Sequence, residues 1–503
     1  MTEQRLQQMS QFADADSLKS ALLWLLFVVL CICVLSFKLD VGISYLELVP
    51  IAVIVILISL AAALYIRHYQ KRLMKNHVRA FALLGLFILL LAAAKLGALL
   101  TKQSSWATGT AVAAAIILTV AYNQRFAIGM SIFYCLFACF AVQAKNDINL
   151  FLTMVTAVFT CCLLLREIRT RMKLLEVSVL AAALVFVISA ASDFWARPQT
   201  HSLVFGAVTE TFSVAEVFHK AGWHAGATLL VGLLIQSLLP LIERVFLIAT
   251  SMTLLDHSDA NQPLLKKLAM EAPGTFSHSL LVGSIAETAA EAIERNGLLC
   301  RVGAYYHDIG KINKAGYFVE NEMGSMSRHK ELSPAMSQLI IVGHVKDGVE
   351  MSKEYGLPAV LRQFIETHHG STLVEYFYNE AKKKHDEKQS PPSENEFRYT
   401  GPKPRSKEAA IVMLADSVEG ATRSLSEVTP TRIEAVVHNM AMKRLQDGQF
   451  DECDLSLREL SQIEASISKT LAAHYHGRIA YPKQPDEPQE EPQTVQANSQ
   501  SDD

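Results

Sequence analysis

Eight apolar runs in the first half of the chain constrain its fold more than any other feature. A helix that crosses a bilayer needs about 20 apolar residues and must satisfy its backbone hydrogen bonds internally. Several runs reach that length, and the shorter ones extend into tolerable flanks. They lie at about residues 21–39, 47–66, 79–101, 107–122, 126–143, 149–165, 174–193 and 226–248. We therefore expect an N-terminal segment (1–20) and a transmembrane domain of about eight helices (21–248).

Basic residues gather in alternate links between these runs, which predicts the orientation of the domain. The links after the second and sixth runs hold Arg67, Lys71, Arg72, Lys75 and Arg79, and Arg166, Arg169, Arg171 and Lys173. The other links carry only one or two cations each, such as Lys38, Lys102 and Lys145. Because positive loops stay in the cytoplasm, both termini and the second half of the chain are expected there. No small-residue cleavage site follows the first run, so we expect an uncleaved anchor.

The link of residues 192–225 is the only sizeable outer segment that this topology leaves. It carries Trp195, Phe212 and Trp223, which we interpret as an interfacial aromatic belt rather than a ligand site. The link between the first two runs, about residues 40–46, is too short to form an outer domain.

Composition narrows the class of protein further. Of 503 residues, 51% are hydrophobic and 19% charged, which is too apolar for a purely soluble protein. The formal charge of −3 argues against a partner that is a nucleic-acid polymer. Most of the eight cysteines lie in apolar runs without CxxC spacing, so we expect them to be packing residues.

The second half of the chain has helical rather than strand periodicity. Residues 249–273 resemble a linker with one short helix that starts near Pro263. Apolar residues then recur at intervals of three and four from Thr275 onward, and Gly297 is expected to end that helix. The fold class predicted is therefore all-α, with a polytopic membrane domain followed by a helical bundle at residues 274–481. Residues 380–408 break the pattern as a loop, and the tail, residues 482–503, is expected to be disordered.

An ordered series of histidines and aspartates lies within this bundle. Lone histidines such as His219 and His438 are ordinarily core or surface residues, but adjacent His-Asp and His-His pairs in one domain indicate metal binding. The candidates are His278, His307, Asp308, His344, His368, His369 and Asp416. One open metal site needs three or four ligands, so seven suit two metals that share a bridging carboxylate. Imidazole with carboxylate favours iron, manganese or another transition metal over magnesium or calcium.

The stretches around these residues resemble the HD-domain phosphohydrolases, and within them the seven-transmembrane HD family. The resemblance is close over residues 239–482 and is carried by PLIERVF, APGTFSHSLL, RVGAYYHDIGKINK, HVKDGVEM, THHGSTLVEYFY, FRYTGPKPRSKEAAIVMLADSVE and DECDLSLREL. The chain departs from the family at Ser277, where a second histidine is usual, and at Lys330, where an Asp is usual. Neither position is among the seven ligands.

The resemblance implies how the ligands divide and what reaction they serve. His278, His307, Asp308 and Asp416 would hold one metal, and Asp308 would bridge to a second held by His344, His368 and His369. Characterised members hydrolyse cyclic di-AMP, which implies a phosphodiesterase producing 5′-pApA at the cytoplasmic face of a bacterial inner membrane. Its cofactors would be two divalent transition-metal ions, Mn²⁺ or Fe²⁺.

Further residues are candidates for contacts with this substrate. Lys311 lies one helical turn past His307 and is expected to bind a phosphate oxygen, although a structural ion pair is the alternative. Arg398, Tyr399, Lys403 and Arg405 resemble family residues and lie either near the substrate or on a surface loop.

Two other functions stay open. The first is hydrolysis of another cyclic nucleotide, but a cyclic di-GMP enzyme of the HD-GYP type would carry an acidic residue and a Gly-Tyr-Pro turn after the His doublet. Here GSTLVEYFY follows His369. The second is a membrane receptor that senses nucleotide without turnover, which would not need seven intact ligands. The sequence does not decide whether the chain forms a homodimer.

Overall fold

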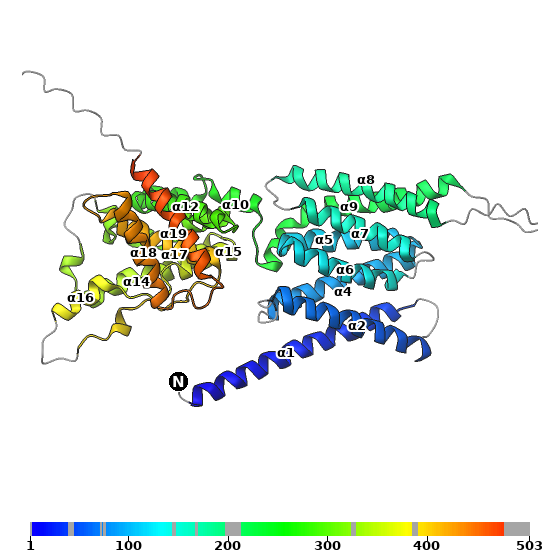
Figure 1. The fold of residues 1–503 in the computed structure, drawn as a ribbon, viewed down its shortest axis with the longest axis horizontal. Coiled ribbons are helices and arrows are strands. Elements are labelled where there is room, and N and C mark those ends of the chain that lie inside the picture. The colour runs from blue at the N-terminus through cyan, green and yellow to red at the C-terminus, as the bar shows by residue number, and fades with distance from the viewer. Residues whose placement is uncertain are drawn as a thin grey trace, which may run out of the picture.

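The computed structural model describes residues 3–38, 45–70, 73, 77–142, 147–165, 170–196, 213–322, 328–384 and 391–476. In these residues the regular structure is helical, and an isolated bridge between Leu373 and Arg398 is the only β pairing. Figure 1 shows a bundle of long helices beside a second helical domain, so the predicted all-α class with two parts is confirmed.

Each predicted apolar run overlaps one helix of the first part, and several runs extend one to three residues past its end. These helices are α1 (Glu3–Ser36), α2 (Tyr45–Tyr69), α4 (His77–Thr101), α5 (Ser105–Ala121), α6 (Gln124–Val142), α7 (Asp147–Leu164), α8 (Arg171–Ala196) and α9 (Val214–Phe246). Six are long and apolar enough to cross a membrane, while α5 and α7 are shorter apolar helices. Large apolar side chains such as Leu46 and Leu89 face outward, where lipid would cover them. The chain is a membrane protein.

Two helices are longer than their apolar runs. α1 begins at Glu3, so most of the predicted N-terminal segment is helical. α9 begins at Val214 and has 33 residues, about 50 Å at 1.5 Å per residue, which exceeds the bilayer core of about 30 Å. The predicted link 192–225 therefore includes the end of α8 and the start of α9. Residues 197–212, which contain Phe212, lie outside the described residues. Trp195 and Trp223 are exposed.

Six of the basic residues that predict the orientation of the membrane domain lie outside the described ranges. They are Lys71, Arg72, Lys75, Lys145, Arg166 and Arg169. His385, within the predicted loop, and the tail 482–503 also lie outside them.

The C-terminal domain begins earlier and differently than the sequence indicates. The predicted linker contains two helices, α10 (Ser251–Ser258) and α11 (Pro263–Glu271), rather than one. Both pack into the domain, because Leu254 and Leu264 belong to the same buried cluster as Tyr306. Gly297 begins the helix α13 instead of ending the one before it.

In the described residues, twelve further α-helices and short 3₁₀ helices complete this domain around two buried clusters. They are α12 (Pro273–Ala292), α13 (Gly297–Tyr306), η1 (Ile309–Tyr317), η2 (Val319–Asn321), η3 (Arg328–Glu331), α14 (Pro334–Glu354), α15 (Ala359–Thr367), α16 (Glu375–Lys383), η4 (Glu394–Phe397), α17 (Lys407–Arg423), α18 (Pro430–Gln446) and α19 (Leu457–His476). One cluster joins α12 with α17, α18 and α19, and the other joins α10 and α11 with η1 and α14. Helices α13 and α15 contribute to both, so their ends lie where the clusters meet.

Candidate metal centre

The seven predicted ligands, which span about 140 residues of sequence, come together where the two clusters meet. His278 lies on α12, His344 on α14 and Asp416 on α17. His307 and His368 cap the C-terminal ends of α13 and α15, and each is followed directly by another ligand, Asp308 or His369. The ligand atoms form two groups that share Asp308, and within each group they lie within 4.8 Å of one another.

Each oxygen of Asp308 faces one of the two groups. Oδ2 lies 3.1 Å from His307 Nε2 and 3.8 Å from His278 Nε2. Oδ1 lies 3.3 Å from His344 Nε2 and 3.5 Å from His368 Nε2. The side chain is 2% exposed, so water does not screen it. This is the geometry of a carboxylate that bridges two cations.

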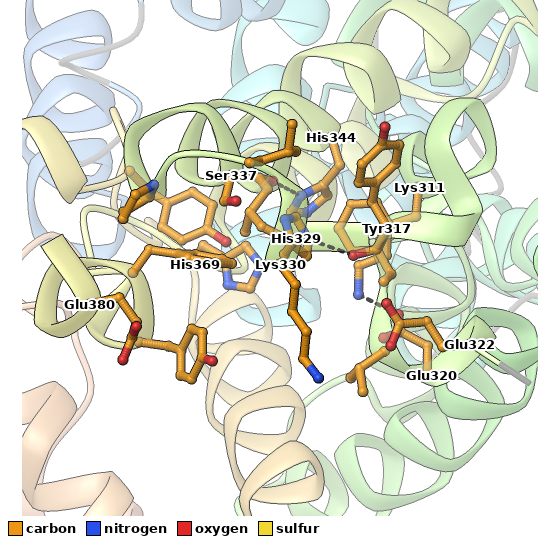
Figure 2. A pocket seen from close by; sticks show the side chains of 18 of the residues that line it. Lys311, Tyr317, Glu320, Glu322, His329, Lys330, Ser337, His344, His369 and Glu380 are labelled. Carbon is orange, nitrogen blue, oxygen red and sulfur yellow. Dashed lines mark hydrogen bonds and ion pairs between the residues drawn. The ribbon is translucent and has the colours of Figure 1, made fainter. Parts of the chain in front are cut away.

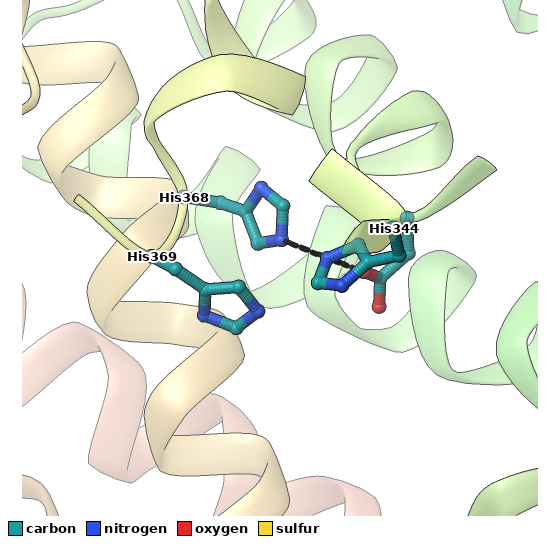
Figure 3. Close-up of side chains that lie close together, drawn as sticks. His344, His368 and His369 are labelled. Atoms are coloured by element: carbon teal, nitrogen blue, oxygen red, sulfur yellow. Dashed lines mark hydrogen bonds and ion pairs between the residues drawn. The ribbon is translucent and has the colours of Figure 1, made fainter. Parts of the chain in front are cut away.

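The imidazoles direct lone pairs, rather than N–H groups, toward the same points. His344 Nδ1 lies 2.5 Å from the carbonyl of Ile341, and His368 Nδ1 lies 3.0 Å from that of Ile365. A carbonyl only accepts, so in each neutral ring Nδ1 carries the proton and Nε2 the lone pair. The two Nε2 atoms nevertheless lie 3.1 Å apart, facing each other (Figure 3). Two acceptors at that distance repel unless a cation lies between them.

The same reasoning holds for the other group. His307 Nδ1 donates to the carbonyl of Ala304 at 2.6 Å, and His307 Nε2 therefore faces Asp308 and Asp416 with a lone pair. Among the described residues, His307 Nε2 and Asp308 Oδ1 are buried atoms without a hydrogen-bond partner. Orphaned buried acceptors are costly, and a divalent ion would satisfy both of them. The residues present fit two divalent metals.

The charges of the site also favour a bound cation. Burial raises the pKa of the Asp308 carboxyl, but the positive charges of His307 and Lys311 outweigh burial and hold the pKa well below its usual range. Burial lowers the pKa of His307, whereas Asp308 and Asp416 raise it to about 10, so these carboxylates favour a positive charge at His307 Nε2, which either a proton or a metal ion on the lone pair would supply. In the second group burial lowers the pKa of His368 and His369, and both rings stay neutral, which is the form that binds metal.

Two carboxylates that the sequence analysis missed hold residues of the site in place. Glu419 Oε2 accepts a hydrogen bond of 2.6 Å from Nδ1 of His278, which fixes the ring and turns its Nε2 toward Asp416. Glu419 lies three residues after Asp416 on α17, and this helical spacing was the available signal. Glu320 pairs with Lys311 at 2.7 Å.

Three glycines let the backbone approach closely around the ligands. A Cβ on Gly310 would collide with the carbonyl oxygen of His344, and Gly348 faces Gly310 across the same contact, so η1 can lie directly on α14. Gly370 follows the His doublet with φ of +52°, a left-handed conformation that favours glycine. These positions allow Asp308 to reach His344 and allow the chain to turn after His369.

A cavity of about 670 Å³ opens beside the second ligand group (Figure 2). His344, His369 and Lys311 line it, and Lys311 Nζ lies 2.7 Å from Asp308 Oδ2. Its remaining wall includes the aromatic residues Tyr317, Phe318, Tyr376, Phe377 and Tyr399, the cations Lys330 and Lys384, and the carboxylates Glu320, Glu322 and Glu380. The tyrosine ring of Tyr399 stacks on His369 with centroids 4.3 Å apart.

The other candidate substrate residues lie away from this cavity. Arg398 pairs with Asp447 at 3.0 Å, Lys403 donates to the carbonyl of Gly448 at 2.8 Å, and Arg405 pairs with Glu452 at 3.0 Å. Of the four residues predicted on this segment, Tyr399 alone lines the cavity. The ion pairs hold the segment against the loop after α18, and substrate contact by the three cations stays a prediction.

Comparisons with known proteins find the same two parts. Residues 45–250 match the family described as 7TM receptor with intracellular HD hydrolase, and residues 275–421 match the HD domain. The cyclic-di-AMP phosphodiesterase PgpH of Bacillus subtilis (strain 168) is 45% identical over 271 residues, which are 52% of this chain and 38% of that protein. The cyclic-di-AMP phosphodiesterase PgpH of Listeria monocytogenes serotype 1/2a (strain 10403S) is 43% identical over 248 residues, 49% of this chain and 34% of that protein.

Solved structures similar to this chain are the HD domain of L. monocytogenes phosphodiesterase PgpH, alone and in complex with cyclic di-AMP. They cover 43% of this chain and 100% of their own, at 44% and 43% identity and a TM-score of 0.41. The matches with the curated relatives span little more than a third of the length of those proteins.

Proposed function

Because the chain belongs to the seven-transmembrane family with an intracellular HD hydrolase domain, we propose that it is a metal-dependent phosphodiesterase that hydrolyses cyclic di-AMP to 5′-pApA. Water would add across one phosphodiester, leaving a 3′-hydroxyl and a 5′-phosphate. The observation that carries the proposal is the pair of ligand groups sharing Asp308, next to a cavity that holds a partly buried lysine, Lys311.

The predicted metal ligands and the residues of the cavity would have different roles in the reaction. When bound, two divalent ions supply an acidified water and positive charge against the phosphodiester, which is negative and resists attack. Asp308 would hold both ions, and Glu419 would keep His278 in the tautomer that binds metal. Lys311, fixed between Asp308 and Glu320, offers a positive charge to a phosphoryl oxygen without being a ligand itself.

The aromatic wall of the cavity suits a nucleotide. Bases stack on aromatic side chains, and each such contact contributes about 1–3 kcal/mol by alanine substitution. Tyr317, Phe318 and Phe377 offer faces for this, and Lys330 adds a cation that forms no ion pair with any described residue. The relatives named as cyclic-di-AMP phosphodiesterases support adenine as the base.

The test is turnover by the purified full chain. We expect hydrolysis of cyclic di-AMP to 5′-pApA, measured by chromatography, when Mn²⁺ or Fe²⁺ is added, and none with a chelator. Asp308→Asn is the matched inactive control. Faster turnover of cyclic di-GMP or a mixed dinucleotide would assign another substrate, and tight binding without turnover would assign a nucleotide receptor.

The proposed enzyme works at a membrane. The basic residues of alternate links favour cytoplasmic termini and a cytoplasmic HD domain, where a second messenger is accessible. The bilayer would cover the exposed apolar side chains of the helices.

A further inference from the structure

A polar cavity of about 510 Å³ lies in the membrane domain, far from the metal centre. It lies between the C-terminal ends of α4 and α8 and the N-terminal ends of α5 and α9. In Figure 1 these ends are at the side of the bundle away from the C-terminal domain. Its volume falls in the range of about 300–1,000 Å³ that is typical of small-molecule sites. Unlike those sites, and unlike the surrounding bundle, its wall is mainly polar.

One wall holds a buried carboxylate with one oxygen available. Asp193 on α8 is 4% exposed. Its Oδ1 accepts from Lys220 of α9 at 3.0 Å and from Asn149 of α7 at 3.3 Å. Within the described part of the chain, Oδ2 has no hydrogen bond. A carboxylate accepts on both oxygens, so Asp193 can still bind a positively charged group.

A second wall joins α5 to α9 through a buried histidine. His224 is 2% exposed, and its two ring nitrogens contact Thr108 at 2.7 Å and Ser104 at 3.3 Å. Both hydroxyls lie at the start of α5, and Ser104 lines the cavity with His224. The floor of the cavity is therefore a fixed arrangement of hydrogen-bonding groups.

Cations complete the site. Lys102, on the link between α4 and α5, lines the cavity and forms no ion pair with any residue that the structure describes. Lys220 has three donors, of which Asp193 takes one, and its side chain is 41% exposed. Two ammonium groups can therefore face an anionic group that enters the cavity.

Charged groups inside a membrane domain are costly and mark functional sites more often than structural ones. A purely structural network would join α7, α8 and α9 by hydrogen bonds and fill the space between them. Here the network borders an open cavity that presents both signs of charge.

We propose that this cavity binds a small zwitterion, a solute that carries a carboxylate and an ammonium group, as amino acids and short peptides do. The carboxylate lies against Lys102 and Lys220, and the ammonium against Asp193. This site does not depend on the proposed hydrolysis, because it concerns binding at the other end of the molecule.

The test uses the full chain in lipid nanodiscs, with thermal unfolding and calorimetric titration. The probes are the individual amino acids, a set of dipeptides, acetate and methylamine at millimolar concentration. We expect a saturable heat and a rise of a few degrees in Tm with at least one amino acid or dipeptide, and neither with acetate or methylamine. Comparing the affinities of the amino acids with those of the dipeptides shows whether the ligand is a free amino acid or a peptide.

Two variants locate the binding. Lys102→Gln, at an exposed position, should weaken it at least tenfold, and Asp193→Asn should do the same. The control is Lys38→Gln on the link between α1 and α2, where Lys38 pairs with Glu47 at 2.6 Å outside the cavity, and it should bind normally. Three outcomes would overturn the proposal: no zwitterion binds, acetate binds as well as any zwitterion, or Lys102→Gln binds like the parent. If Asp193→Asn does not fold, Lys102→Gln still decides.

Discussion

Replacing Glu419 by Gln should weaken metal binding on the His278 side by about 10–100-fold, the usual effect of removing a carboxylate that supports a metal-binding histidine. The hydrogen bond from His278 Nδ1 to Glu419 is 2.6 Å long, and the two residues are 5% and 3% exposed. Gln keeps an acceptor of the same shape but loses the negative charge that makes the ring a better donor to metal. The expected loss equals about 1.4–2.8 kcal/mol of binding free energy.

Gln is the informative substitution because it separates charge from hydrogen bonding. Glu419→Ala would also leave the buried Nδ1–H of His278 without a partner, which costs about 1–3 kcal/mol of folding stability. A loss of metal in the Ala variant would therefore combine misfolding with the effect on the ligand. The Gln variant should unfold near the temperature of the parent when both are compared without metal.

The chain offers a matched control in a second His–Glu pair. His438 Nδ1 lies 2.9 Å from Glu464, but the histidine side chain is 64% exposed and neither residue belongs to a ligand group. Glu464→Gln should change stability by less than about 1 kcal/mol and leave metal affinity unchanged.

The assay is a titration of metal-free protein with Mn²⁺, followed by calorimetry and by metal analysis of the washed protein. Hydrolysis as a function of Mn²⁺ concentration should shift by the same factor as the affinity. Equal affinities in Glu419→Gln and the parent would refute the supporting role of this carboxylate. Equal losses in Glu419→Gln and Glu464→Gln would show that charge at a distance, rather than contact with His278, is responsible.

Four further predictions follow from the site and the topology. Asp308→Ala should remove both metals and abolish hydrolysis, because this carboxylate faces both ligand groups; two retained metals in elemental analysis would contradict the shared site. Lys311→Ala should keep both metals and lower the rate by about 10²–10³-fold, or about 2–4 kcal/mol, with kcat and kcat/KM falling together if the lysine acts in the transition state. Lys330→Ala should raise KM for cyclic di-AMP at unchanged metal content while Lys330→Arg retains the parent value, and Michaelis curves on both variants test this. Reporters fused after Asp503 and within residues 67–79 should report cytoplasm and one within residues 192–225 the opposite side, so a C-terminal fusion on the outer side would reverse the topology.

The membrane helices and the ligands could be predicted because a short segment of sequence is enough to indicate each of them. An apolar run identifies a helix without reference to the rest of the fold, and the pairs His307–Asp308 and His368–His369 identify a metal site wherever they lie. The residues at which the helices begin and end were predicted less well. α9 starts twelve residues before its apolar run at 226, because the residues before it form about three polar, amphipathic turns of the same helix.

Other features of the site depend on partners distant in sequence. Arg398, Lys403 and Arg405 resemble family residues, and the structure adds that carboxylates and a carbonyl at residues 447–452 contact them. The contact of Glu419 with His278 depends on the packing of α12 against α17, which the sequence around Glu419 does not indicate. The predicted linker gave no local sign that Leu254 and Leu264 would enter the core.

The packing of that linker joins the two ends of the molecule. The carboxylate of Glu243, in the last turn of α9, accepts from the backbone N–H of Thr250 at 2.7 Å and from the hydroxyl of Thr253 at 2.9 Å, which ties α9 to α10. α10 in turn offers the carbonyl of His257 to the hydroxyl of Tyr306 at 2.9 Å. Tyr306 immediately precedes the predicted ligand His307, so the helix that carries Lys220 and His224 near its N-terminus is connected, through one short helix, to the candidate metal centre. Each of these contacts is partly buried, and together they form a continuous series of packed groups from α9 to His307.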